Sequence, residues 1–372
     1  VTGDIAQMYL QVRIPEKDRD CLRFLWRNDS GELMEYRMTS HLFGGIWCAS
    51  SSTYALRKTL QDFHSTELVR ESVEKSMYVD DLLKSLITQI EAMAVICGSK
   101  DTLAEGGFDI TQFLANDPEV MSIVPEQDRA QEIKEIAPQM YSKALGLHWD
   151  VTRDEFMYKT KHEVPYGPVT KRIMLSLASS MYDPLGLIMP IIISGRFLFQ
   201  EATKLKLNWD EPVPSALETQ RKTWWVSLEK LERLKFPRCL LPDLFADSAV
   251  ELHHFADASN KAYGAVTYVR ATNKVGSIRV TLLMAKGRVT PLKPITIPRL
   301  ELCAAVTAVE MDQMLRRELQ VCLLPSTFWT DSQIILAYIR SEAHRFKVFV
   351  ANRVSCIREH SQPEQWRYVP TN

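Results

Sequence analysis

Two adjacent carboxylates lie at the centre of the octapeptide Ser76-Met77-Tyr78-Val79-Asp80-Asp81-Leu82-Leu83, between two short apolar runs. This pattern predicts a β-hairpin whose tight turn carries Asp80 and Asp81. Because neighbouring like charges repel, a divalent metal ion bound by hard oxygen ligands would stabilise the pair. The alternative is an ordinary Asp-Asp turn in solvent, and the flanking Tyr78 and Val79 favour the functional interpretation.

The segment Tyr78-Val79-Asp80-Asp81 resembles the catalytic signature of retroviral and retrotransposon reverse transcriptases. A second segment, Asp4-Ile5-Ala6-Gln7-Met8-Tyr9-Leu10-Gln11-Val12, resembles the first palm motif of these enzymes. The resemblance implies that Asp4, Asp80 and Asp81 form a carboxylate triad and that Tyr9 selects deoxynucleotides. Two-metal phosphoryl transfer needs clustered carboxylates, so the implied cofactor is Mg²⁺, with Mn²⁺ as an alternative.

Length and composition set broad limits on the fold. A chain of 372 residues predicts two to three domains, and 46% hydrophobic with 24% charged residues is typical of a soluble globular protein. No uninterrupted apolar run reaches the roughly 18 residues of a membrane span, so no membrane partner is expected. The N-terminus has no initiator Met and no apolar signal core, which predicts a piece of a longer chain.

The seven cysteines are widely spaced and form no C-x-x-C pair, which predicts free thiols in a reducing compartment and no zinc site. His253-His254 could suggest a metal site, but without a second cluster an ordinary buried or surface role is favoured. The net charge of −1 combines −9 over residues 1–160 with +8 over residues 161–372. This asymmetry is weak support for a polyanionic partner.

The first part of the chain contains a predicted hairpin and a predicted nucleotide-contacting loop. Two apolar and aromatic runs, Cys21–Arg27 and Glu32–Met38, flank Asn-Asp-Ser-Gly and predict a β-hairpin. Gly44 and Gly45 precede a helix that is expected to reach about Phe63. Paired glycines allow close approach of a ligand or form a plain turn, and the resemblance favours a loop that contacts template and nucleotide.

The remainder of the palm-like region departs from the family pattern at one position. A helix is predicted over Thr88–Cys97, ended by Gly98. The segment Gly106–Phe113 resembles the next palm motif, where relatives usually carry a lysine at the position of Gln112. A lysine there can donate a proton to the departing pyrophosphate, and Gln112 cannot.

Two further segments complete that region. The acidic, proline-containing stretch up to Gln139 is predicted to be a poorly ordered surface connection. The segment Ala144–Asp150 resembles the grip that positions the primer end in reverse transcriptases.

Three segments resemble the connecting region of the Pao (BEL/Pao) group of long-terminal-repeat retrotransposons: Thr170–Ser176, Tyr182–Pro190 and Lys204–Asp210. Composition alone predicts a helical linker domain. Leu, Ile and Trp at helical spacing usually form a core, so packing is the expected role of most of these residues.

The last region has the order of elements found in ribonuclease H. Strands are predicted over Glu251–Ser259, Ala262–Arg270 and Ile278–Ala285, followed by a helix that starts at Pro298. A short strand, Phe328–Ser332, then leads into a helix over Gln333–Ile339.

By the resemblance to ribonuclease H, three acids are metal-binding carboxylates: Asp257 at a strand end, Glu301 in the first turn of the helix, and Asp331 at the end of the short strand. Isolated acids are mostly solvated surface groups, but three in this order indicate a nuclease site. The fourth carboxylate of the pattern is expected just beyond Val369-Pro370-Thr371-Asn372, outside this chain.

The sequence therefore predicts an α/β protein in three parts: a reverse transcriptase palm with the start of the thumb (1–160), a mostly helical Pao-type thumb or connection region (161–246), and a ribonuclease H-like α/β domain (247–372). The implied function is RNA-directed DNA synthesis joined to ribonuclease H. The alternative is a truncated, inactive relic that at most binds a nucleic-acid duplex. A small-molecule phosphotransferase is disfavoured because no G-x-x-x-x-G-K-[ST] loop is present.

The resemblance also implies partners and substrate contacts. The expected partners are an RNA template, a DNA primer, deoxynucleoside triphosphates and an RNA/DNA hybrid, with protease and integrase segments as neighbours in a polyprotein. Replication in cytoplasmic particles is implied, with a nuclear location as the alternative. The residues expected to contact substrate are Tyr9, Gly44, Gly45, Tyr78 and Gln112.

Overall fold

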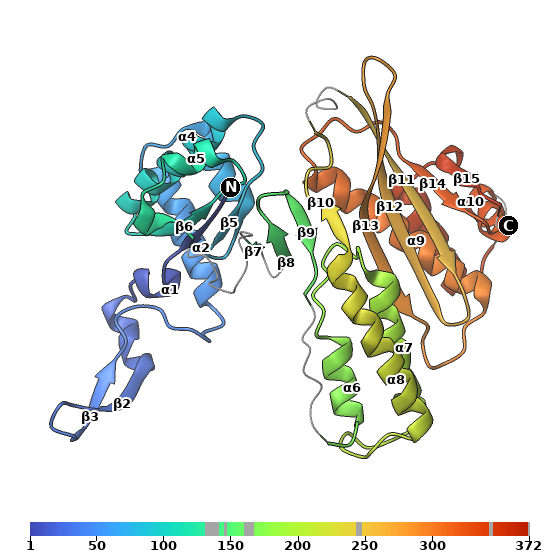
Figure 1. Ribbon diagram of the computed structural model, residues 1–372, viewed down its shortest axis with the longest axis horizontal. Helices are drawn as coiled ribbons and strands as arrows, with labels where there is room; N and C mark the ends of the chain where they lie inside the picture. Colours follow the sequence, from blue (N-terminus) through green and yellow to red (C-terminus); the bar gives the residue numbers. More distant parts are fainter. Residues whose placement is uncertain (131–140, 145–146, 160–166, 243–247, 342–344, 371–372) are drawn as a thin grey trace. The chain divides into compact units, whose positions relative to one another are not determined.

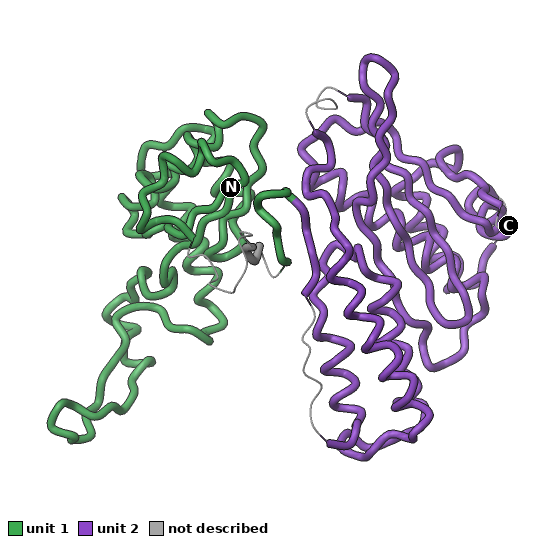
Figure 2. The backbone as a smooth tube through the Cα atoms, in the orientation of Figure 1, with its two compact units in different colours: residues 1–154 green, residues 155–372 purple. Residues whose placement is uncertain are grey.

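The computed structural model describes residues 1–130, 141–144, 147–159, 167–242, 248–341 and 345–370. The chain divides into two compact units, Val1–Asp154 and Glu155–Asn372 (Figure 2). Each unit combines helices and strands around its own buried cluster, which confirms the predicted α/β class. The division into three parts at residues 160 and 246 remains a prediction.

The first unit is built around a small antiparallel sheet in the order β4-β5-β1-β6 (Figure 1). Its strands are β1 (Thr2–Ile5), β4 (Met77–Tyr78), β5 (Asp81–Leu83) and β6 (Ile110–Leu114). Strand β1 pairs with β5 so that Gly3 faces Leu82 and Asp4 faces Asp81. Because side chains alternate along a strand, buried Ile5 and Leu82 point to one face and the two aspartates to the other.

Three helices pack their apolar side chains on the Ile5 and Leu82 face: α2 (Cys48–Asp62), α3 (Glu67–Ser76) and α4 (Gln89–Glu105). Helix α2 ends where the sequence predicted. Helix α4 begins after a capping box between Thr88 and Glu91.

The prediction that Gly98 ends the helix was wrong, because α4 continues through Gly98 to Glu105. A Cβ atom at Gly98 would lie 2.6 Å from Val69 Cγ2 on α3. The glycine therefore allows two helices to pack closely and does not stop one, and close tertiary packing offsets its poor helix propensity.

A short helix, α1 (Met8–Gln11), follows β1. The predicted hairpin is present as β2 (Arg23–Arg27) and β3 (Leu33–Arg37), with all ten residues exposed. Strands β7 (Tyr141–Ala144) and β8 (Leu147–Asp150) form a second hairpin where the primer grip was predicted. Residues 145 and 146 of that segment lie outside the described residues.

The predicted poorly ordered stretch is ordered in its first half, so that prediction was wrong there. It contains α5 (Pro118–Ser122), with Asp117 as its N-cap, and a 3₁₀ turn at Glu126–Asp128. Asp128 is buried and forms an ion pair with Lys100 of α4. Residues 131–140, the other half, lie outside the described residues.

The second unit opens with the helical region that the sequence predicted. It comprises α6 (Lys171–Ala178), α7 (Met189–Lys204) and α8 (Ser215–Leu228), with the paired strands β9 (Glu155–Met157) and β10 (Lys235–Pro237). Helices α7 and α8 cross closely at Gly195, where a Cβ atom would lie 2.4 Å from the Trp224 ring. The Trp224 indole N–H donates a 2.9 Å hydrogen bond to the Ile191 carbonyl.

The rest of the second unit is a five-stranded sheet in the order β13-β12-β11-β14-β15 (Figure 1). The strands are β11 (Ala249–Ala258), β12 (Ala262–Thr272), β13 (Ile278–Val289), β14 (Thr327–Thr330) and β15 (Trp366–Tyr368). The first three are antiparallel neighbours, whereas β11, β14 and β15 run parallel.

One face of this sheet carries the main core of the unit. Helices α9 (Ile297–Glu318), α10 (Gln333–Arg340) and α11 (Val348–His360) contribute to a cluster that includes Leu252, Phe328 and Trp366. Alternate residues of β11 are buried in this cluster, as period-2 patterning requires. The strands and helices predicted between residues 251 and 339 are confirmed, while α11 and β15 were not predicted.

A short segment, residues 183–188, attaches the helical region to the sheet, and we call it the 183–188 clasp. The Leu185 carbonyl accepts a 2.8 Å hydrogen bond from the amide of Ala285 in β13. Gly186 has a φ of +71°, and a Cβ atom there would lie 1.9 Å from the Ala285 carbonyl oxygen. Only glycine fits this position, because both the backbone conformation and the close approach exclude a side chain.

Asp183 is the first residue of the clasp, and its carboxylate holds the segment together through hydrogen bonds. Its carboxylate accepts hydrogen bonds from the amides of Leu187 at 2.9 Å and Ile188 at 3.0 Å, and from the Tyr158 hydroxyl at 2.6 Å. Burial and then the neighbouring Asp183 raise the pKa of Tyr158, so its hydroxyl stays protonated and donates. One carboxylate thereby closes the clasp and joins it to the segment that carries Tyr158.

All seven cysteines are free thiols, as their spacing predicted. In the described part of the chain, no helix is both long enough and apolar enough to cross a membrane.

Candidate active sites

The predicted Asp-Asp hairpin is present at the edge of the first unit's sheet. Strands β4 and β5 pair Tyr78 with Asp81, so Val79 and Asp80 occupy the turn. Val79 has a φ of 59°, a conformation that costs free energy for a β-branched residue. The Asp80 carbonyl accepts a 2.9 Å hydrogen bond from the Ile5 amide, which fixes the turn against β1.

The structure brings Asp4, Asp80 and Asp81 together, as the sequence predicted. Burial raises the pKa of Asp4, and repulsion from Asp80 and Asp81 raises it further. The pKa of Asp81 is also raised, by burial first and then by Asp80. Repulsion therefore opposes the ionisation of Asp4 and Asp81, and a bound cation would relieve it.

Four predicted substrate-contacting residues lie in and beside this sheet. Tyr9 in α1 packs against Phe43 with ring centroids 5.2 Å apart, next to Gly44 and Gly45. Gly44 has a φ of +95°, which favours glycine, and Gly45 could not carry a Cβ without meeting Cys48 Sγ at 2.7 Å. The Tyr78 side chain is 67% exposed.

Gln112 lies in an irregular part of β6. The pairing of β6 with β1 shifts between Asp4 opposite Thr111 and Thr2 opposite Leu114, which leaves an extra residue on β6. Gln112 is exposed and has a φ of 51° at this bulge. A bulge redirects a side chain, here at a position directly after the residue opposite Asp4.

The second acidic site lies at one edge of the second unit's sheet. Strands β11 and β14 run parallel with Phe255 opposite Trp329, and the same register places Asp257 level with Asp331. Because the carboxyl ends of parallel strands meet at the same edge, the two carboxylates are neighbours there. Burial raises the pKa of Asp257, a hydrogen bond from the Ala258 amide opposes this, and repulsion from Asp331 raises the pKa further.

Glu301 reaches the same edge from α9, but not from the predicted position. The helix begins at Ile297, one residue earlier than predicted, so Glu301 is its fifth residue and lies beyond the first turn. Glu301 Oε2 accepts a 2.6 Å hydrogen bond from the hydroxyl of Ser332, the residue after Asp331. This bond ties Glu301 to the Asp331 edge.

Ser332 is a site residue that the sequence analysis did not single out. Its Oγ atom also accepts from the Ile335 amide at 3.3 Å and so forms the N-cap of α10. A serine just before an apolar helical segment is a recognisable cap signal. The second role, holding Glu301, depends on a contact 31 residues away in the sequence.

The carboxylates of both sites suit a hard cation in charge and in donor atom. In the part of the chain that the structure describes, however, no three His, Cys, Asp or Glu side chains are grouped closely enough to hold a metal ion. The predicted Mg²⁺ or Mn²⁺ therefore remains a prediction for both sites.

His254, the second residue of the histidine pair, is part of the core. The His254 ring is fully buried, with Nδ1 2.8 Å from Thr267 Oγ1 and Nε2 3.0 Å from Asp312 Oδ1. Burial acts to raise the pKa of Asp312, but hydrogen bonds from His254 and Ser326 and the charge of Arg316 hold it below its usual value. A satisfied buried network explains His254 without a metal.

The second unit has strands with acids at their parallel ends and a helix carrying a third acid, as expected for a ribonuclease H-like domain. The first unit has an antiparallel sheet that carries three aspartates, as expected for a reverse transcriptase palm. A family model described as the Pao retrotransposon-like RNaseH-like domain matches residues 170–332. Over this segment, which is less than half of the chain, the sequence is similar to that domain of the Pao retrotransposons. The match begins at Thr170, so it includes the helical region as well as the sheet.

Solved structures agree on the fold. The foamy viral protease-reverse transcriptase dRH in complex with double-stranded DNA is similar with a TM-score of 0.57 at 13% identity. All of the present chain is covered by this match and spans 56% of the foamy viral chain. At this identity the likeness shows a shared fold.

Two other structures score too low to support an argument. The foamy viral protease-reverse transcriptase with double-stranded DNA has a TM-score of 0.27 at 14% identity, covering 100% of this chain and 68% of that one. Ribonuclease H1 from the archaeon Halobacterium salinarum NRC-1 has a TM-score of 0.23 at 14% identity, covering 32% of this chain and 86% of that one. The comparison with curated proteins gives no match.

Proposed function

We propose that the edge carrying Asp257, Glu301 and Asp331 is a metal-dependent nuclease site that cleaves the RNA strand of an RNA/DNA hybrid. The observation that carries this proposal is the parallel register of β11 and β14, which sets Asp257 level with Asp331. The Ser332 hydroxyl then ties Glu301 to the same edge. The family match of residues 170–332 supports it independently.

The chemistry follows from the residue types. Bound Mg²⁺ or Mn²⁺ would be held by Asp257, Glu301 and Asp331 and would supply Lewis acidity and an activated water. The chain's own contribution is to present oxygen ligands from two strand ends and one helix. Repulsion between Asp257 and Asp331 in the metal-free chain favours cation binding there.

Cleavage of a labelled RNA/DNA hybrid by the full chain, in Mg²⁺ and separately in Mn²⁺, tests the nuclease. Asp331→Asn should reduce the rate by about 10³-fold or more, because it removes a metal ligand. Asp210→Asn is the matched control, since Asp210 is exposed and pairs with Arg172 away from this edge. Equal cleavage by the two variants would exclude Asp331 as a catalytic residue.

We further propose that Asp4, Asp80 and Asp81 support RNA-directed DNA synthesis on an RNA template with a DNA primer and deoxynucleoside triphosphates. Pairing of β1 with β5 and the β4–β5 turn bring the three carboxylates to one part of the sheet, which supports the proposal because phosphoryl transfer with two metals needs clustered carboxylates. Tyr9, packed on Phe43, would select the sugar, while Gly44, Gly45, Tyr78 and Gln112 would line the substrate.

Primer extension on an RNA template tests this second activity. Extension that is present in the full chain and vanishes in the double variant Asp80→Asn, Asp81→Asn would establish catalysis by the palm carboxylates. A folded chain that binds template and primer but never extends would contradict it.

Duplex binding without turnover is the second candidate function. It is favoured by the absence, among the described residues, of a group of three side chains able to hold a metal ion. Gln112 also favours binding without DNA synthesis, because its side chain cannot act as the proton donor. A chain that binds a hybrid tightly yet neither cleaves nor extends it in either metal would establish this candidate.

A further inference from the structure

Residues 258–300 contain eight Lys or Arg residues and no Asp or Glu. This segment begins directly after Asp257 and ends directly before Glu301, two of the acids of the proposed nuclease site. Since the whole chain has a formal net charge of −1, all of its other residues together are negative. The segment between two of the three carboxylates therefore carries a net positive charge, and the rest of the chain carries a net negative charge.

Six of these eight basic residues lie toward the two ends of the β12–β13 hairpin. Arg270, Lys274 and Arg279 lie at the end remote from Asp257, and Arg270 is neutralised by Glu251 at 2.6 Å. Lys261, Arg288 and Lys293 lie at the Asp257 end, where the Lys261 carbonyl accepts a 2.9 Å hydrogen bond from the Thr290 amide. We call these last three residues the basic strip.

The basic strip is available to a ligand. All three side chains are exposed, and within the described residues they make no hydrogen bond or ion pair. Arg288 is paired across β12 with Tyr263, which is itself paired with Ala258, the neighbour of Asp257. At one strand spacing of about 4.8 Å per step, the Arg288 backbone lies roughly 10 Å from that of Ala258, so the strip is close to the Asp257 edge.

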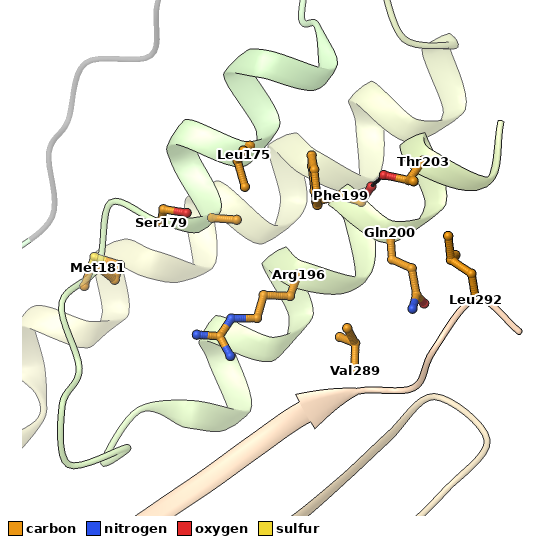
Figure 3. A pocket seen from close by; sticks show the side chains of 10 residues that line it. Leu175, Ser179, Met181, Arg196, Phe199, Gln200, Thr203, Val289 and Leu292 are labelled. Carbon is orange, nitrogen blue, oxygen red and sulfur yellow. Dashed lines mark hydrogen bonds between the residues drawn. The ribbon is translucent and has the colours of Figure 1, made fainter. Parts of the chain in front are cut away.

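Helix α7 of the helical region is bonded to the end of β13, near two of the three residues of the strip, Arg288 and Lys293. Arg196 Nη1 donates to the Gly287 carbonyl at 3.3 Å, and Gln200 Nε2 donates to the Thr290 carbonyl. Figure 3 shows Arg196 and Gln200 on α7, with Gln200 extended toward Val289 and Leu292. The bond to Gly287 fixes the backbone directly before Arg288. The bond to Thr290 fixes it two residues after Arg288 and three residues before Lys293.

A groove beside Asp257 is lined by residues of both the sheet and the helical region. It has a volume of about 530 Å³ and is lined by Gly264 and Gly287 from the sheet and by Met189 and Ile193 from α7, with Asp257 at its margin. Gly264 lies between Asp257 and Gly287 in the sheet register. The helical region therefore forms part of the wall next to the proposed nuclease edge.

Resting on the proposed nuclease function, we infer that the basic strip binds the phosphodiester backbone of the nucleic acid that crosses the Asp257 edge, and that α7 positions the strip. Free, exposed Lys and Arg side chains supply the sequence-independent electrostatic attraction that phosphates require. Gln200 and Arg196 act as positioning residues, since they reach the strip only through the backbone of its loop.

The test measures binding of a 20-base-pair RNA/DNA hybrid to the full chain in EDTA, where no turnover occurs. The triple variant Lys261→Ala, Arg288→Ala, Lys293→Ala should raise Kd roughly tenfold or more and lower the slope of log Kd against log salt by nearly three. The control removes the same charge elsewhere, through Lys222→Ala, Lys230→Ala and Lys274→Ala, all exposed positions outside the strip. Its salt slope should change far less.

A second measurement locates the contact directly. A photo-crosslinking side chain placed at Lys293 should form adducts with the hybrid, and the same group placed at Lys274 should not. An unchanged Kd and slope in the triple variant, or equal crosslinking from both positions, would overturn the inference. Hybrid bound through the strip without any cleavage in Mg²⁺ or Mn²⁺ would instead overturn the proposed function and leave the strip intact.

Discussion

The two acidic sites of this chain are assembled in different ways. In the first unit, Asp4 and Asp81 face each other across an antiparallel strand pair, and Asp80 occupies the adjoining turn. In the second unit, Asp257 and Asp331 end parallel strands, and Glu301 comes from a helix and is restrained by Ser332. Both sites therefore depend on pairing between strands that are distant in the sequence. The first is held by backbone pairing and a tight turn, whereas in the second a side-chain hydrogen bond also restrains one of the acids.

The largest expected effect is a reciprocal separation of two activities. Asp257→Asn should reduce hybrid cleavage by about 10³-fold or more and leave primer extension unchanged, because the two carboxylate sets are in different units. Asp81→Asn should do the opposite. Both variants are measured in both assays, and a loss of both activities in either variant would contradict two independent sites.

The buried network around Asp312 should be the next most sensitive feature. Asp312→Asn removes the charge partner of Arg316 and disturbs the bonds to His254 and Ser326, so the free energy of unfolding should fall by about 2 to 4 kcal/mol. Urea denaturation measures the loss. Glu318→Gln, at an exposed pair with Arg317, serves as the control and should have almost no effect.

The pH dependence of this loss has a defined sign. Asp312 has a lowered pKa in the folded chain, so its contribution to stability is present above its ordinary pKa and is lost as the pH falls through the folded value. The difference between wild type and Asp312→Asn should therefore shrink in acid. A difference that grew as the pH fell would contradict the assignment.

Substitution of Ser332 should have an effect of intermediate size, and it tests whether the hydrogen bond to Glu301 matters for the second site. Ser332→Ala should lower the free energy of unfolding by about 1 kcal/mol through loss of the α10 cap. It should also slow hybrid cleavage by roughly 10- to 100-fold through release of Glu301. Ser332→Thr keeps the hydroxyl and should restore both. Restoration of stability without cleavage would show that the cap matters and the bond to Glu301 does not.

The smallest effect is expected at Asp4. In metal-free buffer at pH 7, Asp4→Asn should stabilise the first unit by about 0.5 kcal/mol after allowance for solvent screening, because it removes a carboxylate that two others repel. Amide hydrogen exchange in β1 and β5 measures this gain. The raised pKa means that the wild-type chain loses stability as pH rises through the folded value, so the gain should vanish near pH 4.

The architecture was predictable where sequence patterns are local. The apolar runs around Asn28–Gly31 and around Asp80 predicted their hairpins, and alternation along residues 251–259 predicted a strand with Asp257 near its end. The resemblance to ribonuclease H singled out Glu301 and Asp331 as candidate site residues. These features depend on neighbouring residues, which a sequence shows directly.

What could not be predicted depends on contacts between distant residues. From the sequence alone, Gly98 is expected to end a helix. Only the structure shows that Val69 packs closely against it. The bonds from Ser332 to Glu301 and from His254 to Asp312 join residues 31 and 58 positions apart. Helix α11 buries only Val354 and Ile357, too few apolar positions for a clear periodic signal.

The 183–188 clasp has a consequence for how such a chain can change by recombination. The hydrogen bond from Ala285 to Leu185 and the close approach at Gly186 join segments about a hundred residues apart in the sequence. A crossover near residue 247 would give a chimera whose helical region and sheet come from different parents. Because most of this joint is main chain, diverged parents remain compatible as long as the parent that supplies the helical region keeps an aspartate and a glycine at positions 183 and 186.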